Sequence, residues 1–164
     1  MNKSSNQYQE LVNGIKDKYN ATYLGAGDNG VALELPSGKV IKVTTDSVEL
    51  EHAETLKDTS SDAIIPIEKV KIIGKDLGYI IMANANKLTP EEETLIKDTR
   101  EDAESYLLDG DKDALNSIKD NVKLLNLITG IEKAYQSTGM DIEEIDYSAD
   151  NIMNYNNKFV MVDL

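Results

Sequence analysis

The sequence predicts an α+β fold in which a small antiparallel sheet precedes a group of helices. Short runs rich in β-branched residues, separated by Gly, Pro, Asn and Asp, fill most of residues 23–82. Apolar residues at helical spacing dominate residues 89–137. At 164 residues the chain fits one domain, or two small parts that share a core.

Composition narrows the class of function. A net charge of −13 disfavours binding to nucleic-acid phosphates and to an anionic membrane surface. The absence of Cys removes disulfides, zinc thiolate sites and thiol nucleophiles. The first residues lack a signal-peptide core, and no run approaches the roughly 18 apolar residues of a membrane span. We therefore expect a soluble, cytoplasmic protein that binds neither nucleic acid nor membrane.

The first notable motif is Gly25-Ala-Gly27-Asp-Asn-Gly30, which follows an amphipathic helix expected from about Ser5 to Tyr19. Residues 31–35 after the glycines have strand character, and residues 36–39 read as the turn of a hairpin. Glycines that join two antiparallel strands let bare backbone approach a ligand such as a phosphate. A hairpin loop without a ligand is the alternative.

A lysine lies in the middle of the next strand, at residues 39–44. Alternation places Val40 and Lys42 on one face of this strand and Ile41 and Val43 on the other. Solvent exposure is the usual explanation for such a lysine. Directly after a glycine loop, a role in ligand binding is favoured.

A helix from Asp46 to about Lys57 follows, with Asp46 as N-cap and Glu49 three residues on. Glu49, Glu51 and Glu54 compete as the partner of Lys42. At about 100° per residue Glu49 lies nearest the centre of the apolar face, so we select it, although it could also only close the capping box. His52 falls on the polar side and is expected to be exposed.

The remaining elements are two strands and two long helices. The strands are expected at residues 64–73 and 77–82. One helix should run from Thr89, with Pro90 at its first position, to about Leu108, and another from about Asp113 to Ser137. Asp109-Gly-Asp111 between them is interpreted as a helix-helix turn, since no EF-hand calcium loop aligns.

The last stretch carries oxygen ligands. Asp146 and Asn151 lie in a loop at D-x-x-x-x-N spacing, and the apolar run from Lys158 delivers Asp163 at its end. Carboxylate and amide oxygens suit magnesium, a hard cation that is usually bound together with substrate phosphates. An Asp/Asn-rich turn before a final strand is the alternative.

Taken in order, these residues resemble the protein-kinase fold, and the resemblance covers nearly the whole chain. It implies an N-lobe at residues 1–83, a reduced helical C-lobe at residues 84–164, and bound ATP with magnesium or manganese. The implied binding residues are the glycine loop of Gly25, Gly27 and Gly30, the hinge of Met82, Ala83 and Asn84, and Lys42 held by Glu49. Asp146 would act on the attacking hydroxyl, and Asn151 and Asp163 would hold the metal.

The sequence also departs from the family pattern. Glu144 and Ile145 replace the His and Arg before the catalytic Asp, and only Leu164 follows Asp163. The resemblance therefore implies a minimal kinase without the activation loop and most of the C-lobe. Such economy would suit a phage or mobile-element protein.

Three functions are compatible with these residues. The first is an ATP- and magnesium-dependent phosphotransferase that acts on Ser or Thr hydroxyls of a protein, or on itself. The second is a pseudokinase that binds a nucleotide or a regulated partner protein without catalysis. The third is a small-molecule kinase, which normally has a larger helical lobe. The expected partners are a protein substrate, a regulated protein, or a second copy of the chain.

Overall fold

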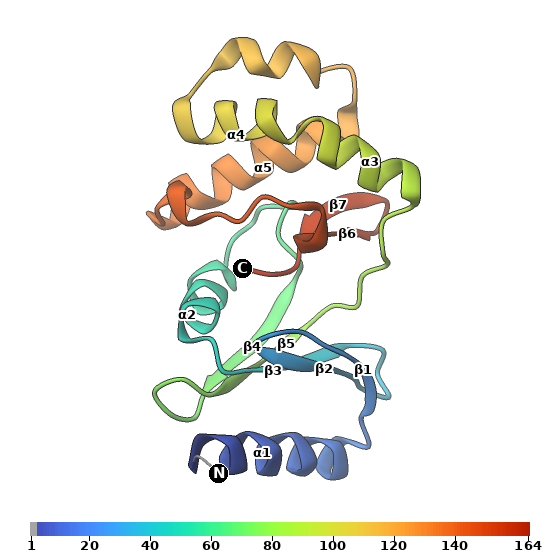
Figure 1. The fold of residues 1–164 in the computed structure, drawn as a ribbon, viewed down its shortest axis with the longest axis vertical. Helices are drawn as coiled ribbons and strands as arrows, with labels where there is room; N and C mark the ends of the chain where they lie inside the picture. The colour runs from blue at the N-terminus through green and yellow to red at the C-terminus, as the bar shows by residue number, and fades with distance from the viewer. Residues whose placement is uncertain (1–2) are drawn as a thin grey trace. The chain divides into compact units, whose positions relative to one another are not determined.

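A computed structural model describes residues 3–164, which form two compact units (Figure 1). The first unit extends to Asp58 and includes Pro66–Asn84, whereas the second contains Thr59–Ile65 and Ala85–Leu164. This division differs from the single expected boundary after residue 83, because residues 59–65 belong to the second unit. There the Ile65 N–H donates to the Met161 carbonyl at 3.0 Å, and the Met161 N–H donates to Ala63 at 2.8 Å.

The first unit is built on an antiparallel sheet with the strand order β1-β2-β3-β5-β4. The pairing of residues 64 and 65 with Met161, followed by Pro66, explains why the fourth strand begins three residues later than expected. The strands are β1 (Thr22–Ala26), β2 (Gly30–Glu34), β3 (Val40–Thr44), β4 (Ile67–Ile72) and β5 (Gly78–Met82).

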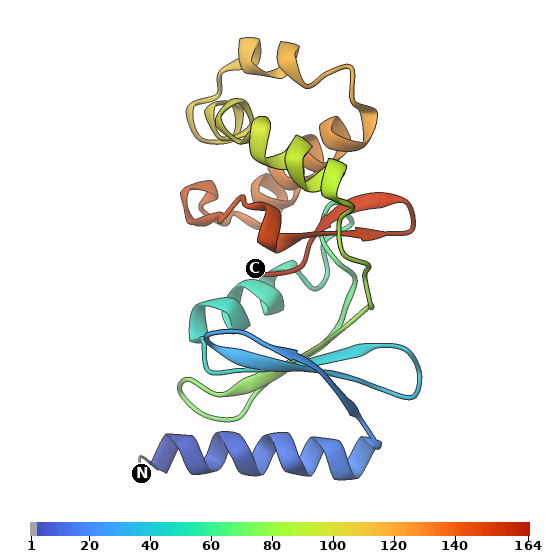
Figure 2. The same ribbon diagram turned by 45° about the vertical axis from the view of Figure 1, so that its right-hand side comes forward.

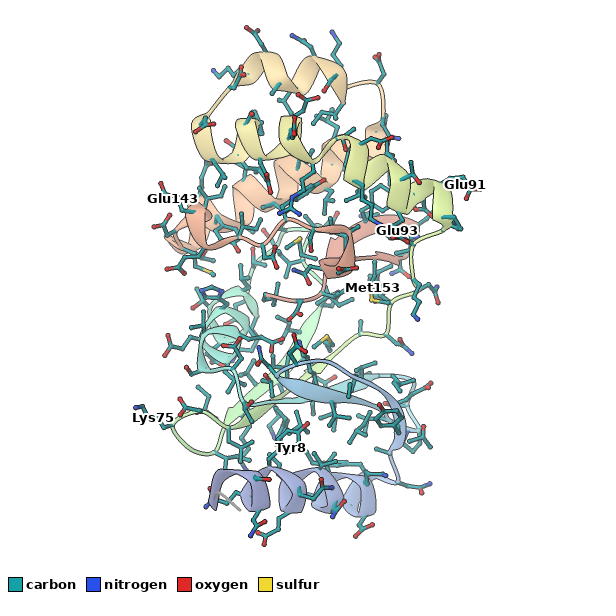
Figure 3. All side chains as sticks on the ribbon, in the orientation of Figure 1. Tyr8, Lys75, Glu91, Glu93, Glu143 and Met153 are labelled. Carbon is teal, nitrogen blue, oxygen red and sulfur yellow. The ribbon has the colours of Figure 1, made fainter. Side chains whose placement is uncertain are left out.

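Helix α1 (Lys3–Tyr19) lies across one face of this sheet (Figure 2). Val12 and Ile15 of the helix pack with alternate residues of β2, β3 and β5, and Tyr8 points from the helix toward the sheet (Figure 3). Ile41 and Val43 belong to this core, so strand alternation turns Lys42 to the opposite face.

Helix α2 (Ser47–Leu56) packs against β3, β4 and β5. The Asp46 carboxylate caps it, accepting from the Val48 and Glu49 N–H groups as the sequence predicts. The expected exposure of His52 is wrong, because its side chain is buried at 9 % exposure. The helix buries a wider arc than its apolar residues alone indicate, and this arc includes Glu49 and His52.

The second unit is mainly helical and ends in a β-hairpin. Within it, α5 supplies the core residues Leu124, Leu127, Ile128, Ile131 and Ala134. Its elements are α3 (Pro90–Asp98), α4 (Arg100–Asp109), η1 (Lys112–Ser117), α5 (Val122–Thr138), η2 (Ile142–Glu144), η3 (Ala149–Asn151), β6 (Ile152–Tyr155) and β7 (Lys158–Met161).

Each of the two expected long helices is interrupted. The first breaks at Thr99, whose hydroxyl donates to the Leu95 carbonyl at 2.7 Å, a bond that favours bending of a helix. The second breaks before Val122, because the Asn121 side chain accepts from the Leu124 N–H at 3.0 Å and caps a new helix. Gly110 and Gly139 end α4 and α5 in the left-handed conformation, as the sequence predicts.

Candidate functional site

The glycine motif of the first unit forms a tight hairpin between β1 and β2. The Gly27 N–H donates to the Gly30 carbonyl at 2.9 Å and closes the turn. Gly30 is required by packing, since a β-carbon there would lie 2.2 Å from the Val43 carbonyl oxygen. Gly25 and Gly27 face open space, so no side chain covers the backbone at these two positions.

The tip of this hairpin is tied to the start of α2 through Asn29. The Asn29 carbonyl accepts from the Thr45 N–H at 2.8 Å and from the Thr45 hydroxyl at 3.1 Å. The Asn29 amide donates to the Asp46 carboxylate at 3.3 Å. The loop position is therefore coupled to the cap of the helix that carries Glu49. Sequence reasoning did not single out Asn29, because this contact joins residues that are far apart in the chain.

Lys42 of β3 forms an ion pair with Glu49 of α2. The pairing chosen from the helical face is thus present. The Glu49 side chain is 5 % exposed and that of Lys42 is 22 % exposed, so the pair is largely removed from water. Strand register places Ala32 and Ile80 on either side of Lys42. This gives the ammonium group a defined position on the face of the sheet opposite α1.

Residues 82–84, expected as a hinge, begin with Met82, the last residue of β5. Met82 is buried and pairs with Val40 of β3. The Ala83 N–H donates to the Pro66 carbonyl at 3.0 Å, so this amide is already engaged. Asn84 is exposed.

In the second unit, Asn151 locks the loop that begins at Asp146. The Asn151 Nδ2 donates to the main-chain carbonyl of Asp146 and to its Oδ2, both at 3.0 Å. The Asp146 side chain is exposed. These bonds hold the carboxylate in a defined orientation at the surface while leaving its Oδ1 for another contact.

Tyr147 anchors the same loop. Its side chain is 1 % exposed, and its hydroxyl has no hydrogen-bond partner among the described residues. Burial raises the pKa of the Tyr147 phenol, and the charge of Glu104 raises it further. The buried ring fixes the backbone immediately after Asp146. The sequence offered a signal for this anchor, since an aromatic residue interrupts an otherwise polar loop.

Asp163 follows the end of β7, and a main-chain bond connects this region to Asn151. The Val162 N–H donates to the Asn151 carbonyl at 2.9 Å, which brings the end of the chain alongside the loop. Because the Asn151 amide nitrogen faces Asp146, its Oδ1 is directed elsewhere. The amide oxygen of Asn151 and the carboxylate of Asp163 are donors that fit magnesium.

The residues expected to hold magnesium include few carboxylates. Within residues 3–164, no three His, Asp or Glu side chains form a cluster suited to a metal ion. A metal held here would therefore depend on the Asn151 oxygen, and on a ligand such as phosphate for its remaining positions.

Arg100 is the one arginine in the sequence, and its charge acts on this loop. The Nε–H of Arg100 donates to Glu104 at 2.7 Å. The pKa of the guanidinium is raised, first by this hydrogen bond and further by the charges of Glu104 and Asp146. Helix α4, which Arg100 begins, packs against η2 just before the loop. Sequence reasoning overlooked Arg100, although its uniqueness was a signal.

Comparison with known proteins gives a fold but no family. No protein-family model and no curated protein sequence matches the chain. Two crystal structures of the kinase domain of PknI from Mycobacterium tuberculosis are similar to it. A double mutant has a TM-score of 0.53 at 12% identity, and a second structure of this kinase domain has a TM-score of 0.51 at 11% identity. The described chain has a kinase-like fold.

The likeness covers only part of the kinase domain. Each match includes 87% of this chain and 57% of the PknI kinase domain. At this identity the kinase-like fold carries no statement about activity. Among residues 3–164, no helix is long and apolar enough to span a membrane.

Proposed function

We propose that this chain binds ATP with magnesium and transfers the γ-phosphoryl group to a Ser or Thr hydroxyl of a protein. The ion pair between Lys42 and Glu49 is the observation that carries the proposal. A lysine held by a buried carboxylate, next to a glycine hairpin, is an arrangement suited to phosphates. The kinase-like fold supports the same reading.

Each unit supplies part of the required chemistry. In the first unit, the main chain at Gly25 and Gly27 approaches the phosphates and Lys42 pairs with them. In the second unit, Asn151 and Asp163 hold magnesium, which when bound neutralises charge on the phosphates. The Asp146 carboxylate orients the acceptor hydroxyl. These roles are mostly positioning, which is the main requirement of phosphoryl transfer.

The transfer step needs one proton acceptor. The hydroxyl oxygen bonds to the γ-phosphorus while the bond between that phosphorus and the β–γ bridging oxygen breaks, and ADP leaves. The hydroxyl proton passes to the Asp146 carboxylate. The hydrogen bonds from Asn151 keep that carboxylate in place for the acceptor.

The test is transfer of radiolabelled phosphate from ATP, with magnesium or manganese, to the chain itself and to a general acceptor protein. Lys42→Ala and Asp146→Asn should each reduce transfer by roughly 100-fold or more. The matched controls are Lys39→Ala and Asp120→Asn, which alter exposed side chains outside the candidate site. Transfer that survives in both site variants, or falls equally in the controls, would contradict the proposal.

A pseudokinase is the second candidate, and Asp28 favours it. This exposed carboxylate lies at the tip of the glycine hairpin, where it would oppose the approach of phosphates. Under this alternative, ATP raises the melting temperature of the wild type and not of Lys42→Ala, and no label moves under any metal condition.

A further inference from the structure

A groove lined by lysines runs along α5 in the second unit, outside the candidate phosphotransfer residues. One side of it is α5, from Val122 to Lys133, and the other is formed by residues 60–62 and the hairpin turn at 156–159. We call it the lysine groove, after Lys123, Lys133 and Lys158. The second unit carries eight Lys and Arg against nineteen Asp and Glu, so three cations in one groove stand out from an acidic surface.

The walls of the lysine groove are held together tightly. The Ser61 hydroxyl donates to the Gly130 carbonyl of α5 at 2.6 Å. A β-carbon at Gly130 would lie 2.6 Å from the Ala63 β-carbon, so only glycine permits this approach. Glycine at position 130 therefore allows this wall of the groove to form.

Two lysines of the groove, Lys158 and Lys123, already bind carboxylates of the chain itself. Lys158 pairs with Asp62 at 2.7 Å, and both side chains are exposed. The pKa of Asp62 is lowered, first by the hydrogen bond and charge of Lys158 and additionally by the charge of Lys133. Asp62 therefore marks a position within the groove where an anionic group is favoured.

The third lysine lies at the other end. Lys123 pairs with Glu92 at 2.9 Å, and its ammonium lies 4.3 Å from the centre of the Phe159 ring. Lys133 lies ten positions after Lys123 in α5, which corresponds to about 15 Å along the helix. A single phosphate cannot span this length, whereas about five residues of extended peptide can.

We propose that the lysine groove binds an extended acidic segment of a partner protein. Carboxylates of the segment pair with Lys133 and Lys158, displacing Asp62, and the segment extends along α5 toward Lys123. The exposed amides of Asn126, Asn156 and Asn157 bond its main chain. Side-chain amides both donate and accept, which suits a peptide backbone. The chain's net charge of −13 opposes a long polyanion such as nucleic acid, so a short acidic peptide is the better ligand.

The test measures binding of a fluorescein-labelled hexapeptide of alternating Glu and Asp by fluorescence anisotropy at low salt. Wild type should bind it saturably, and Lys133→Glu should weaken binding about tenfold or more, the size of a lost charge pair that is partly desolvated. Lys119→Glu is the matched control, because it makes the same charge change at an exposed lysine outside the groove. Its effect should stay below about twofold, since distant exposed charges are screened.

Asp62→Asn gives a prediction of opposite sign. Removing the carboxylate that competes for Lys158 should tighten peptide binding by about threefold, of the order expected for an exposed ion pair. Equal weakening by Lys133→Glu and Lys119→Glu would overturn the proposal, as would absence of saturable binding. Tighter binding of a six-nucleotide DNA strand than of the peptide would also overturn it. Circular dichroism confirms that each variant is folded.

Discussion

The two units hold their candidate residues in different ways. In the first unit, Lys42 and Glu49 lie on a strand and a helix, and the ion pair between them is largely buried. In the second, Asp146 lies between η2 and η3 and Asn151 ends η3, and a bond from the Asn151 side chain to the Asp146 main chain holds the loop. A strand and a helix hold Lys42 and Glu49 in place, whereas a few individual contacts hold Asp146 and Asn151.

This difference determines where each site is vulnerable. Substitution of a single anchoring residue should disturb the loop of the second unit. The loop has no sheet hydrogen bonds that could hold it in place once the anchor is lost. In the first unit the sheet stays in place when the ion pair is removed, and the cost is that of the lost pairing between Lys42 and Glu49. The following four predictions, from the largest effect to the smallest, test this contrast.

Truncation of Tyr147 should have the largest effect on stability. Tyr147→Ala removes a fully buried ring and should lower the free energy of unfolding by about 3–5 kcal/mol. Tyr147→Phe keeps the ring and deletes a hydroxyl without a partner in the described chain, so stability should stay level or rise. Urea unfolding measures both variants. A large loss in Tyr147→Phe would reveal that the hydroxyl has a structural role.

Breaking the ion pair of the first unit should cost less. Glu49→Gln removes the carboxylate of this largely buried ion pair and should lower the free energy of unfolding by about 2–3 kcal/mol, somewhat below the value for a fully buried pair because Lys42 keeps contact with water. Replacement of both residues, Lys42→Met with Glu49→Leu, should restore most of that loss. Failure of the double variant to recover would indicate that the two side chains do not act as a pair.

Two glycines in helices should respond in opposite directions. Gly130→Ala places a methyl group 2.6 Å from Ala63 and should destabilise the protein by about 1–3 kcal/mol. Gly14→Ala in α1 meets open space and should stabilise it by about 0.5–1 kcal/mol. Thermal unfolding distinguishes the two. A neutral Gly130→Ala would show that residues 59–65 yield readily, contrary to the close packing described.

The smallest predicted effect is a dependence on pH. Burial opposes ionisation of Glu92, but hydrogen bonds from Lys123, Asn154 and the Thr89 main chain outweigh it and place the pKa of Glu92 below 4.5. A depressed carboxyl pKa stabilises the fold above the unfolded-state value, and this stability is lost as pH falls through the folded-state value. Glu92→Gln should therefore reduce the decline in stability below pH 4.5 by about 1 kcal/mol. If wild type and Glu92→Gln lose the same free energy of unfolding between pH 5 and about pH 2, this prediction is wrong.

Local signals in the sequence predicted much of the fold. The Asp46 cap, the start of α3 at Thr89-Pro90 and the ends of α4 and α5 at Gly110 and Gly139 all follow from residue type at one position. Strand alternation placed Lys42 on the face opposite Ile41 and Val43, and in the structure these two residues pack under α1. These features depend on contacts within a few residues.

The features that escaped prediction depend on contacts distant in sequence. Residues 59–65 join the second unit because they pair with β7, about a hundred positions further along the chain. His52 is buried because the packing of α2 covers more than its apolar stripe. For the candidate site, motif spacing indicated Asp146, Asn151 and Asp163, but only the structure reveals the roles of Tyr147 and Asn29 as anchors.

The most direct test of the central claim is the affinity for ATP with and without magnesium, measured by titration calorimetry on wild type, Lys42→Ala and Asp163→Ala. We predict that each substitution weakens binding of the magnesium complex by about tenfold or more, the size of a lost charge-assisted contact. Lys42→Ala should retain the effect of magnesium, whereas Asp163→Ala should lose it. If Asp163→Ala binds ATP as wild type does and magnesium makes no difference, the second unit takes no part in nucleotide binding and the proposed function is wrong.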